Sequence, residues 1–223
     1  MKTAMILAAG RGERLKPLTD KVPKALCIVQ DKPLIEHHIE KLVQAGFGHL
    51  VINHAYLGSQ IRRKIGHGSR WGVDISYSAE PPGGLETGGG IVKALPLLGN
   101  EPFITVNADI YTDFDFKHLP RAELTYLHLV LTKKNPELGH HGDFGLVNAR
   151  QLTNTPREYT FAGIACYNPE IFQGLPQGRY SVSHLMRDYA QAGKASAELY
   201  EGVWFDIGSL ERLKAVNDFL KRH

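Results

Sequence analysis

Short apolar runs alternate with amphipathic segments along the first half of the chain. The apolar runs are typical of buried β-strands, and they occupy residues 3–9, 49–53, 74–79 and 102–109. The segments with helical periodicity are residues 33–46, 58–66 and 89–99. Pro96 is expected to break the last of these helices. Strands that alternate with helices at this spacing predict βαβ units and a mainly parallel sheet.

The pattern changes after Asp113. Extended segments follow one another with fewer helices between them, at residues 124–132, 144–150, 158–168 and 195–208. Residues 135–145 read as a polar loop, and helices are expected at 181–193 and 209–222. Because no low-complexity linker or repeat interrupts the chain, we expect one Rossmann-like α/β domain over residues 1–223. Its mixed, mainly parallel sheet is flanked by helices, and the second half of the chain extends the sheet of the first.

Composition narrows the class of protein. The 223 residues are 43% hydrophobic and 22% charged, as in ordinary globular domains. A net charge of +3 is too small to indicate a nucleic-acid binder. Cys27 and Cys166 suggest no disulfide framework and read as small core residues, which favours a cytoplasmic protein. The first strand starts near Thr3, which leaves no room for a signal peptide, and no apolar run reaches the roughly 18 residues of a membrane span.

The stretch LAAGRGERLKPLTDKVPKAL, Leu7 to Leu26, follows the first strand directly. Gly10 and Gly12 allow backbone N–H groups to approach phosphate oxygens. The stretch carries five cations within fifteen residues, at Arg11, Arg14, Lys16, Lys21 and Lys24. It lacks the lysine–serine/threonine ending of a Walker loop and the third glycine of a dinucleotide fingerprint. The residues therefore favour a site for several phosphates, with a surface loop as the alternative.

These residues also resemble the sequence motifs of a known enzyme family. LAAGRGERLKPLT followed by PKAL resembles the signature of the sugar-1-phosphate nucleotidyltransferases, and ETGGG, VNADIY and WFDIGS resemble later motifs of that family in the same order. The resemblance covers nearly the whole chain and implies a GT-A-like fold. It also implies a nucleotide-binding half at about 1–115 and a sugar-binding half at about 116–223.

The family reaction is the attack of a sugar-1-phosphate oxygen on the α-phosphate of a nucleoside triphosphate, with release of pyrophosphate. The resemblance implies that Arg14 and Lys24 bind the phosphates and that Asp109 and Asp206 hold Mg²⁺ as the cofactor. Asp109 also ends an apolar strand, at the edge where ligands bind in open α/β sheets. Asp113 and Asp115 lie beyond that strand end and read as turn and cap residues.

Further contacts are expected around these residues. For the nucleotide, the resemblance implies backbone contacts at Gly12 and Glu13, and base contacts at Glu80, Leu85 and Gly88. Asn107 shares a sheet face with Asp109 and is expected to bond the sugar or the ribose. The resemblance places further sugar contacts at Asp143 and Gly145, and Gly163 would let a sugar lie close to the backbone. The adjacent residues His140 and His141 are expected to point in opposite directions, and the sequence shows no third ligand near them. A zinc site is therefore disfavoured.

Within the family, the short chain, LETGGGI and the HHGDF loop are most similar to uridylyltransferases that act on N-acetylmuramate 1-phosphate, in cell-wall sugar recycling. The expected partners are UTP and a sugar 1-phosphate, with no nucleic acid or membrane, in a monomer or small homo-oligomer. Two alternatives stay open. One is a transferase for mannose, glucose or N-acetylglucosamine 1-phosphate, or for phosphocholine, with GTP, dTTP or CTP. The other is a non-catalytic nucleotide-binding subunit.

Overall fold

A computed structural model describes residues 2–119, 126–136 and 139–222. The first residues of the strand predicted at 124–132, and two residues of the predicted polar loop, lie outside the described residues.

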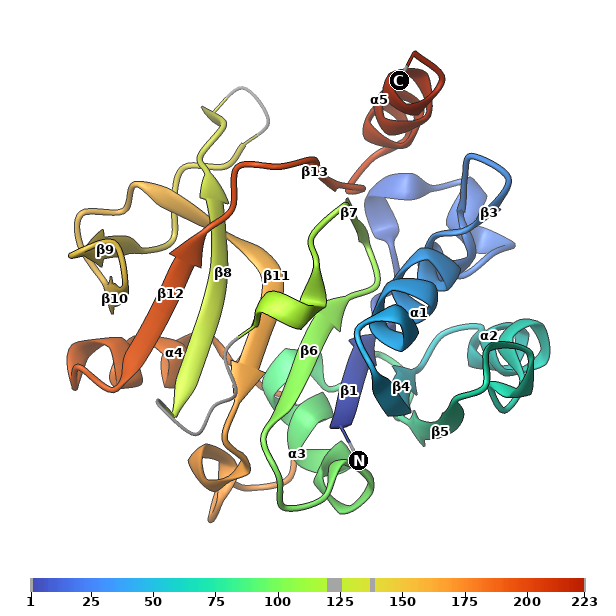
Figure 1. The fold of residues 1–223 in the computed structure, drawn as a ribbon. Helices are drawn as coiled ribbons and strands as arrows, with labels where there is room; N and C mark the ends of the chain where they lie inside the picture. The colour runs from blue at the N-terminus through green and yellow to red at the C-terminus, as the bar shows by residue number, and fades with distance from the viewer. Residues whose placement is uncertain (1, 120–125, 137–138, 223) are drawn as a thin grey trace.

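A mixed sheet runs through the middle of the molecule, with helices on both faces (Figure 1). In the described part of the chain it has nine strands in the order β5–β4–β1–β6–β11–β8–β12–β10–β9. Their bounds in chain order are β1 Lys2–Leu7, β4 Phe47–His54, β5 Asp74–Ala79, β6 Phe103–Asn107, β8 Leu127–Lys133, β9 Gly145–Val147, β10 Gln151–Thr153, β11 Tyr159–Tyr167 and β12 Ala195–Leu199. The predicted α/β class and mixed sheet are confirmed.

Strand direction changes where the two halves of the chain meet. Strands β5, β4, β1 and β6 are parallel to one another. Strand β11 then lies antiparallel between β6 and β8, and β12 runs parallel to β8. The second half of the chain therefore extends the sheet of the first, as predicted.

The helices form two layers because successive strand residues point to opposite faces of the sheet. Ala4 and Ile6 of β1 belong to a core cluster with Ile39 of α1, whereas Met5 belongs to a second cluster with Ile91 of α3. The helix bounds are α1 Leu34–Gln44, α2 Gly58–Ile65, α3 Glu86–Leu98, α4 Ser183–Gln191 and α5 Leu210–Leu220. Helix α1 therefore covers one face of the sheet, and α3 covers the other.

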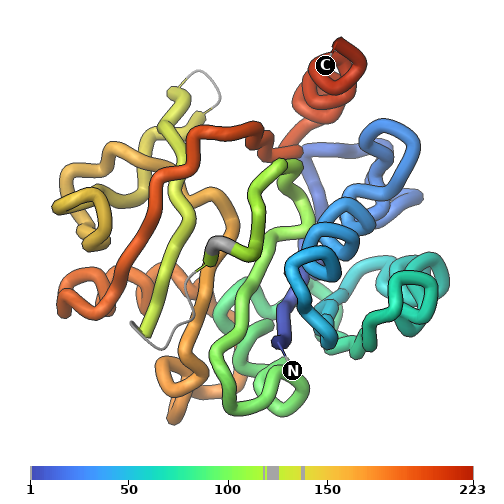
Figure 2. Tube along the Cα trace, in the orientation of Figure 1, coloured from blue at the N-terminus to red at the C-terminus, as the bar shows by residue number. Residues whose placement is uncertain are grey.

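A short ladder brings the end of the chain back to the first half. Strand β7 (Ile110–Thr112) starts just after β6 and pairs antiparallel with β13 (Trp204–Asp206). Beyond β13, Val216 of α5 joins a buried cluster with Leu15 and Leu34. Figure 2 shows this return, with the red C-terminal helix beside the blue N-terminal segments. A second two-stranded ladder joins β2 (Ile28–Val29) to β3 (Lys32–Pro33).

Two sequence predictions are wrong in detail. Helix α3 is not broken at Pro96, because only two helical residues follow the proline, so its missing N–H lies in the last turn. The helix also begins at Glu86, three residues before the predicted start. The strand predicted at 144–150 is limited to β9, because Asn148 and Ala149 adopt left-handed conformations with φ of 51° and 55°.

The interpretation of both cysteines as core residues is confirmed, since both are buried and free.

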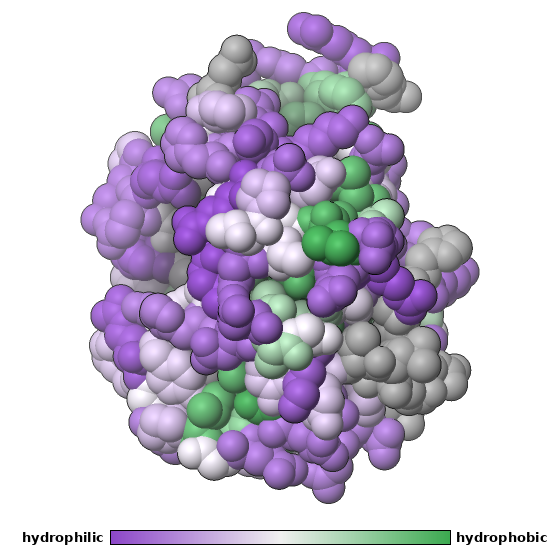
Figure 3. Space-filling model, turned by 90° about the vertical axis from the view of Figure 1, so that its left-hand side faces the viewer, coloured by the Kyte–Doolittle hydropathy of each residue, from purple (hydrophilic) through white to green (hydrophobic). Residues whose placement is uncertain are grey.

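The sheet edge at β9 and β10 faces solvent. Figure 3 views the molecule from this side and shows a mostly hydrophilic surface with a few separate hydrophobic patches. The edge strand β9 has only three residues, which limits pairing with other chains. Among the described helices, none combines the length and hydropathy that a membrane crossing requires.

Candidate active site

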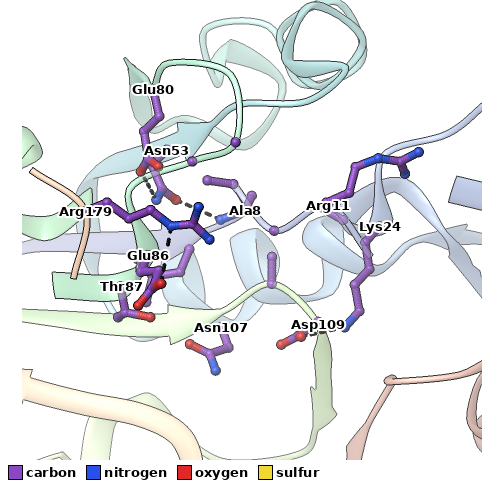
Figure 4. Close-up of a pocket in the computed structure, with 17 residues that line it drawn as sticks. Ala8, Arg11, Lys24, Asn53, Glu80, Glu86, Thr87, Asn107, Asp109 and Arg179 are labelled. Carbon is purple, nitrogen blue, oxygen red and sulfur yellow. Dashed lines mark hydrogen bonds and ion pairs between the residues drawn. The ribbon is translucent and has the colours of Figure 1, made fainter. Parts of the chain in front are cut away.

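A cavity of about 340 Å³ lies at the carboxyl ends of the parallel strands (Figure 4). Its wall includes the segment after β1, the ends of β4 and β6, and the loop between β5 and α3. The polar and charged residues of the wall are Arg11, Lys24, Asn53, Glu80, Glu86, Thr87, Asn107, Asp109 and Arg179. Open α/β sheets bind ligands at this edge. Four predicted site residues with side chains, Lys24, Glu80, Asn107 and Asp109, are thus brought together with Gly10.

Lys24 and Asp109 form an ion pair across the cavity wall. Lys24 Nζ lies 2.6 Å from Asp109 Oδ2, and the lysine side chain is only 13% exposed, against 41% for the aspartate. Pro23 precedes Lys24 in an extended conformation and leads into a short 3₁₀ turn that starts at the lysine. The pair joins residues 85 positions apart in the sequence. Lys24 therefore presents a single charge beside the carboxylate that follows β6.

The β7–β13 ladder places Asp206 beside Asp109. Asp206 pairs with Ile110, the residue after Asp109, and the Ile207 N–H donates to the Asp109 carbonyl over 2.8 Å. The two carboxylates have different partners, however. Asp206 is bonded by Arg212, and its other oxygen lies 3.2 Å from His140 Nε2. The ladder thus brings the backbones of the two predicted metal ligands together.

Polar side chains from several segments hold this ladder in place. His38 Nε2 donates to the Ile110 carbonyl over 2.8 Å, and burial lowers the pKa of His38 to about 4. Asp113 accepts hydrogen bonds from the Val203 N–H, over 2.8 Å, and from the Tyr200 hydroxyl, and burial raises the pKa of Tyr200. Asp115 caps the 3₁₀ turn that follows. The predicted cap role of Asp115 is confirmed, whereas Asp113 bonds the segment before β13 rather than a turn.

The donors at this edge suit a hard divalent cation. Mg²⁺ takes oxygen ligands, usually one or two protein carboxylates with phosphates and waters. Asp109 and Asp206 supply two carboxylates on neighbouring backbone positions. Over residues 2–119, 126–136 and 139–222, no three or more His, Cys, Asp or Glu side chains gather as a possible metal-ligand group. The residues present therefore fit Mg²⁺ together with a phosphate ligand.

The five cations of the N-terminal stretch separate in the fold. Arg11 donates to the Thr19 carbonyl over 2.7 Å and to Asp20 over 2.6 Å, and its guanidinium stacks 3.8 Å above the Tyr56 ring. Arg14 points elsewhere, to the segment after Asp206. A Cβ placed on Gly208 would lie 3.0 Å from Arg14 Nη2 and 3.1 Å from Nη1 of Arg212. Arg14 therefore lies on the Asp206 side of the site, outside the cavity wall.

The turn before Arg14 has a local structure of its own. Gly12 adopts φ 72°, and its carbonyl accepts a hydrogen bond from the Thr19 hydroxyl over 2.8 Å. A Cβ at Gly12 would lie 3.2 Å from the Lys24 Cβ, so the glycine also leaves room for the lysine. Glu13 is exposed and pairs with Lys16. Neither Gly12 nor Glu13 is among the described residues that line the cavity.

A hydrogen-bond relay fixes the loop between β5 and α3. The Ala8 N–H donates to Asn53 Oδ1 over 2.8 Å, and Asn53 Nδ2 donates to Glu80 Oε1 over 2.6 Å. The Leu85 N–H donates to Glu80 Oε2 over 2.7 Å. Asn53 is 2% exposed and Glu80 is 9% exposed. Both oxygens of Glu80 are thus bonded inside the protein, although the residue also lines the cavity.

The first turn of α3 is packed against a loop from the second half of the chain. A Cβ on Gly88 would lie 2.7 Å from the Tyr180 ring, and one on Gly89 would lie 1.9 Å from the Gly178 carbonyl oxygen. Gly88 therefore meets Tyr180 in this structure, and neither Gly88 nor Leu85 lines the cavity among the described residues. Their predicted contact with a base stays a prediction.

Two of the four predicted sugar contacts lie together. The ladder between β11 and β8 shifts register between Phe161 and Ile164, and Gly163 adopts φ 77° within this bulge. A Cβ on Gly163 would lie 2.9 Å from Asn107 Nδ2, so the bulge supports the Asn107 side chain. Trp204 fixes the same bulge by donating to the Ala162 carbonyl over 2.9 Å. Gly163 thus sits beneath a residue that lines the cavity.

The other two lie outside the described cavity wall. Asp143 accepts a hydrogen bond from the Phe161 N–H over 2.9 Å, which ties its loop to β11. Gly145 is packed against backbone, because an added Cβ would lie 2.3 Å from the Pro156 carbonyl oxygen. Both residues have clear structural roles, and their predicted sugar contacts stay predictions.

Sequence reasoning missed several residues of this site. Asn107 ends β6 and Asn53 lies one residue before the end of β4, so the same strand-end argument identifies Asn53. Arg212 and His140 contact Asp206, but nothing in their sequence spacing indicates this. Arg179 reaches the cavity from a glycine- and proline-containing loop that carries no motif.

Residues 3–223 match a family model described as Nucleotidyl transferase. The chain is 46% identical over 222 residues to N-acetylmuramate alpha-1-phosphate uridylyltransferase of Neisseria meningitidis serogroup B (strain ATCC BAA-335 / MC58), covering 95% of each chain. It is 32% identical over 226 residues to the protein of that name from Caulobacter vibrioides (strain ATCC 19089 / CIP 103742 / CB 15), covering 93% of this chain and 92% of the relative. UDP-glucose pyrophosphorylase complexed with UDP-glucose has the same fold, with TM-score 0.78, 20% identity and full coverage of both chains.

Proposed function

Because the chain belongs to the nucleotidyl transferase family, we propose that it makes UDP-N-acetylmuramate and pyrophosphate from UTP and N-acetylmuramate 1-phosphate. The specific substrates come from the two named relatives, one of which shares 46% of its residues with this chain over 95% of its length. That reaction belongs to cell-wall sugar recycling, and the proposed location is the cytoplasm. The N-terminal half, about 1–115, would bind the nucleotide, and residues 116–223 the sugar.

The observation that carries this proposal is the ion pair of Lys24 with Asp109, over 2.6 Å, beside the backbone of Asp206. Nucleotidyl transfer brings two anions together, so the barrier is mainly charge repulsion and alignment. The site supplies a nearly buried cation and two carboxylates at one end of the sheet. This combination serves phosphate chemistry rather than hydride transfer or hydrolysis by a nucleophilic side chain.

In the proposed reaction, a phosphate oxygen of the sugar 1-phosphate forms a bond to the α-phosphorus of UTP. The bond from that phosphorus to the bridging oxygen of the β-phosphate breaks, and pyrophosphate leaves with the electron pair. The attacking oxygen is already anionic at neutral pH, so no general base is required. Lys24 neutralises charge on the α-phosphate and on the incoming phosphate, and Arg14 binds the β- and γ-phosphates.

Asp109 and Asp206 would hold Mg²⁺, which supplies charge neutralisation of the phosphates when it is bound. In this structure cationic side chains hold both carboxylates, Lys24 at Asp109 and Arg212 at Asp206. These ion pairs fix the positions of the two carboxylates. The uracil is proposed to lie along the loop that holds Glu80, Leu85 and Gly88, close to the phosphate-loop residues Gly10, Gly12 and Glu13.

The deciding experiment is a panel of nucleotides and sugar phosphates scored by pyrophosphate release. UTP with N-acetylmuramate 1-phosphate should give the highest kcat/KM. Higher activity with GTP and mannose 1-phosphate, or with another pair, would replace the proposed substrates while leaving the reaction class. Nucleotide binding with no pyrophosphate released from any pair would instead indicate a regulatory subunit.

Asp109→Asn tests the metal role. We expect the variant to need a higher Mg²⁺ concentration for half-maximal pyrophosphate release, and to bind Mn²⁺ more weakly in calorimetric titrations with UTP. Asp74→Asn is the matched control, because Asp74 is exposed and begins β5 at the opposite end of the sheet. Metal titrations of Asp109→Asn that superimpose on those of the unmodified protein would remove Asp109 from the metal site.

A further inference from the structure

One cation of the cavity wall comes from the second half of the chain. Arg179 lies in the loop before α4, and its guanidinium extends into the cavity from the side opposite Lys24 (Figure 4). Its side chain is 62% exposed and its Nε lies 3.3 Å from Glu86 Oε1. In the proposed reaction Arg14 and Lys24 bind the phosphates, but Arg179 has no role.

The backbone on both sides of Arg179 is fixed to α3. The Tyr180 N–H donates to the Leu85 carbonyl over 3.1 Å, and the Gly89 N–H donates to the Tyr180 carbonyl over 3.2 Å. The neighbouring Gly178 carbonyl is so close to Gly89 that any side chain there would overlap it. The direction of Arg179 is therefore set by packing, while its guanidinium remains in solvent contact.

The partner of Arg179 is itself held in an unfavourable conformation. Glu86 adopts φ 59°, a left-handed backbone conformation that residues other than glycine rarely adopt. Its side chain is 46% exposed, and exposed ion pairs of this kind contribute little. A substrate carboxylate can therefore replace Glu86 as the partner of Arg179 at little cost.

The other cations of the described cavity wall already have partners suited to other tasks. Arg11 is bonded to Asp20 and the Thr19 carbonyl, and Lys24 is bonded to Asp109. Among the described cations of the wall, Arg179 is thus the one whose ion pair joins two exposed side chains. An acceptor substrate that carries a second anionic group besides its phosphate can pair that group with Arg179. N-acetylmuramate differs from N-acetylglucosamine by such a group, the carboxylate of its lactyl ether.

We infer that Arg179 binds the lactyl carboxylate of the acceptor sugar, in place of Glu86, and so selects N-acetylmuramate 1-phosphate over N-acetylglucosamine 1-phosphate. The inference rests on the proposed function. The planar guanidinium matches a carboxylate in a two-pronged geometry that a lysine cannot reproduce. Arg179 then acts on substrate specificity and has no part in the bond changes at phosphorus.

The test compares two acceptors that differ in one charge, N-acetylmuramate 1-phosphate and its analogue with the lactyl carboxylate converted to a carboxamide. The variants are Arg179→Gln, Arg179→Lys and the control Arg63→Gln, which removes an exposed cation from α2. For each protein we would measure the KM for both acceptors and for UTP, and the Kd of both acceptors by calorimetry. Circular dichroism confirms folding.

The unmodified protein and Arg63→Gln should bind the acid about 10- to 100-fold more tightly than the amide. Arg179→Gln should bind the two equally, with the KM for UTP unchanged and kcat largely retained, and Arg179→Lys should be intermediate. Equal losses for acid and amide in Arg179→Gln, or an unchanged acid preference, would overturn the inference. If the unmodified protein does not use N-acetylmuramate 1-phosphate at all, the proposed substrate fails instead, and the two failures are distinct.

Discussion

Replacing Glu80 by glutamine should destabilise the protein although the side chain keeps its size and shape. The relay through this residue has a fixed direction, because the Ala8 N–H donates to Asn53 Oδ1 and so turns Asn53 Nδ2 toward Glu80. The second oxygen of Glu80 receives the Leu85 N–H. Residue 80 must therefore accept two hydrogen bonds. Glutamine in either orientation places its NH₂ group against another donor.

The expected cost follows from burial. Asn53 is 2% exposed and Glu80 is 9% exposed, so water cannot replace the lost bond. A buried donor without an acceptor costs about 2 kcal/mol. Asn53→Asp should cost a similar amount, because it sets an acceptor against Glu80. The double variant Asn53→Asp/Glu80→Gln moves the carboxylate one residue along the relay and satisfies every group. Its loss of stability should therefore be smaller than that of either single variant, instead of the additive 4 kcal/mol or so.

Urea unfolding followed by tryptophan fluorescence measures these free energies of unfolding. Glu101→Gln, at an exposed position, is the control and should change stability by less than about 0.5 kcal/mol. Additive losses in the double variant would refute the assigned direction of the relay. Full stability of Glu80→Gln alone would show that the relay is not buried in solution.

Three further changes test the site and its frame. Lys24→Ala should lower kcat by about 100-fold or more with the melting temperature nearly unchanged, since the role proposed for Lys24 is to neutralise phosphate charge. Near-normal turnover would remove Lys24 from the reaction. Gly89→Ala should lower the free energy of unfolding by about 2 kcal/mol, because the added methyl group displaces the 178–180 loop. Gly10→Ala is the control and should leave stability unchanged, because its Cβ meets nothing within 4 Å. Equal unfolding midpoints for the two variants would refute this. His38 has a pKa of about 4 in the fold against 6.5 when exposed, so the unfolded chain binds the proton more strongly and stability falls as pH drops from 6.5 toward 4. Between pH 7 and pH 5, the free energy of unfolding of His38→Gln should fall by about 2 kcal/mol less than that of the unmodified protein. Parallel curves of stability against pH for the two proteins would contradict the lowered pKa of His38.

The sequence predicts the elements well where apolar periodicity decides structure. Strand β5 is found at the predicted residues, and α1 and β4 lie within a few residues of the predicted bounds. Lys24 and Asp109 were found by different arguments, one from the cationic stretch and one from a strand end. Their ion pair shows that both arguments concern the same cavity.

The position of Asp206 could not be derived from residue pattern alone. Strand β13 has three residues and pairs with a strand of equal length, so neither has enough residues to show alternation. Only the ladder shows that residues 97 positions apart in the sequence lie on adjacent strands. Arg179 was missed for a similar reason, because its position depends on contacts between a loop and a helix.

The glycines of ETGGG illustrate a limit of interpreting glycine-rich loops as ligand cradles. A Cβ on Gly90 would lie 2.6 Å from Glu80 Oε1, and one on Gly89 would overlap the Gly178 carbonyl. Both glycines are thus required by protein contacts, one to the relay and one to the 178–180 loop. Because α3 is packed against both, a displacement of the Arg179 loop must also move the first turn of this helix. The parts of the cavity wall that come from the two halves of the chain are therefore joined through these glycines, so a displacement of one part should move the other.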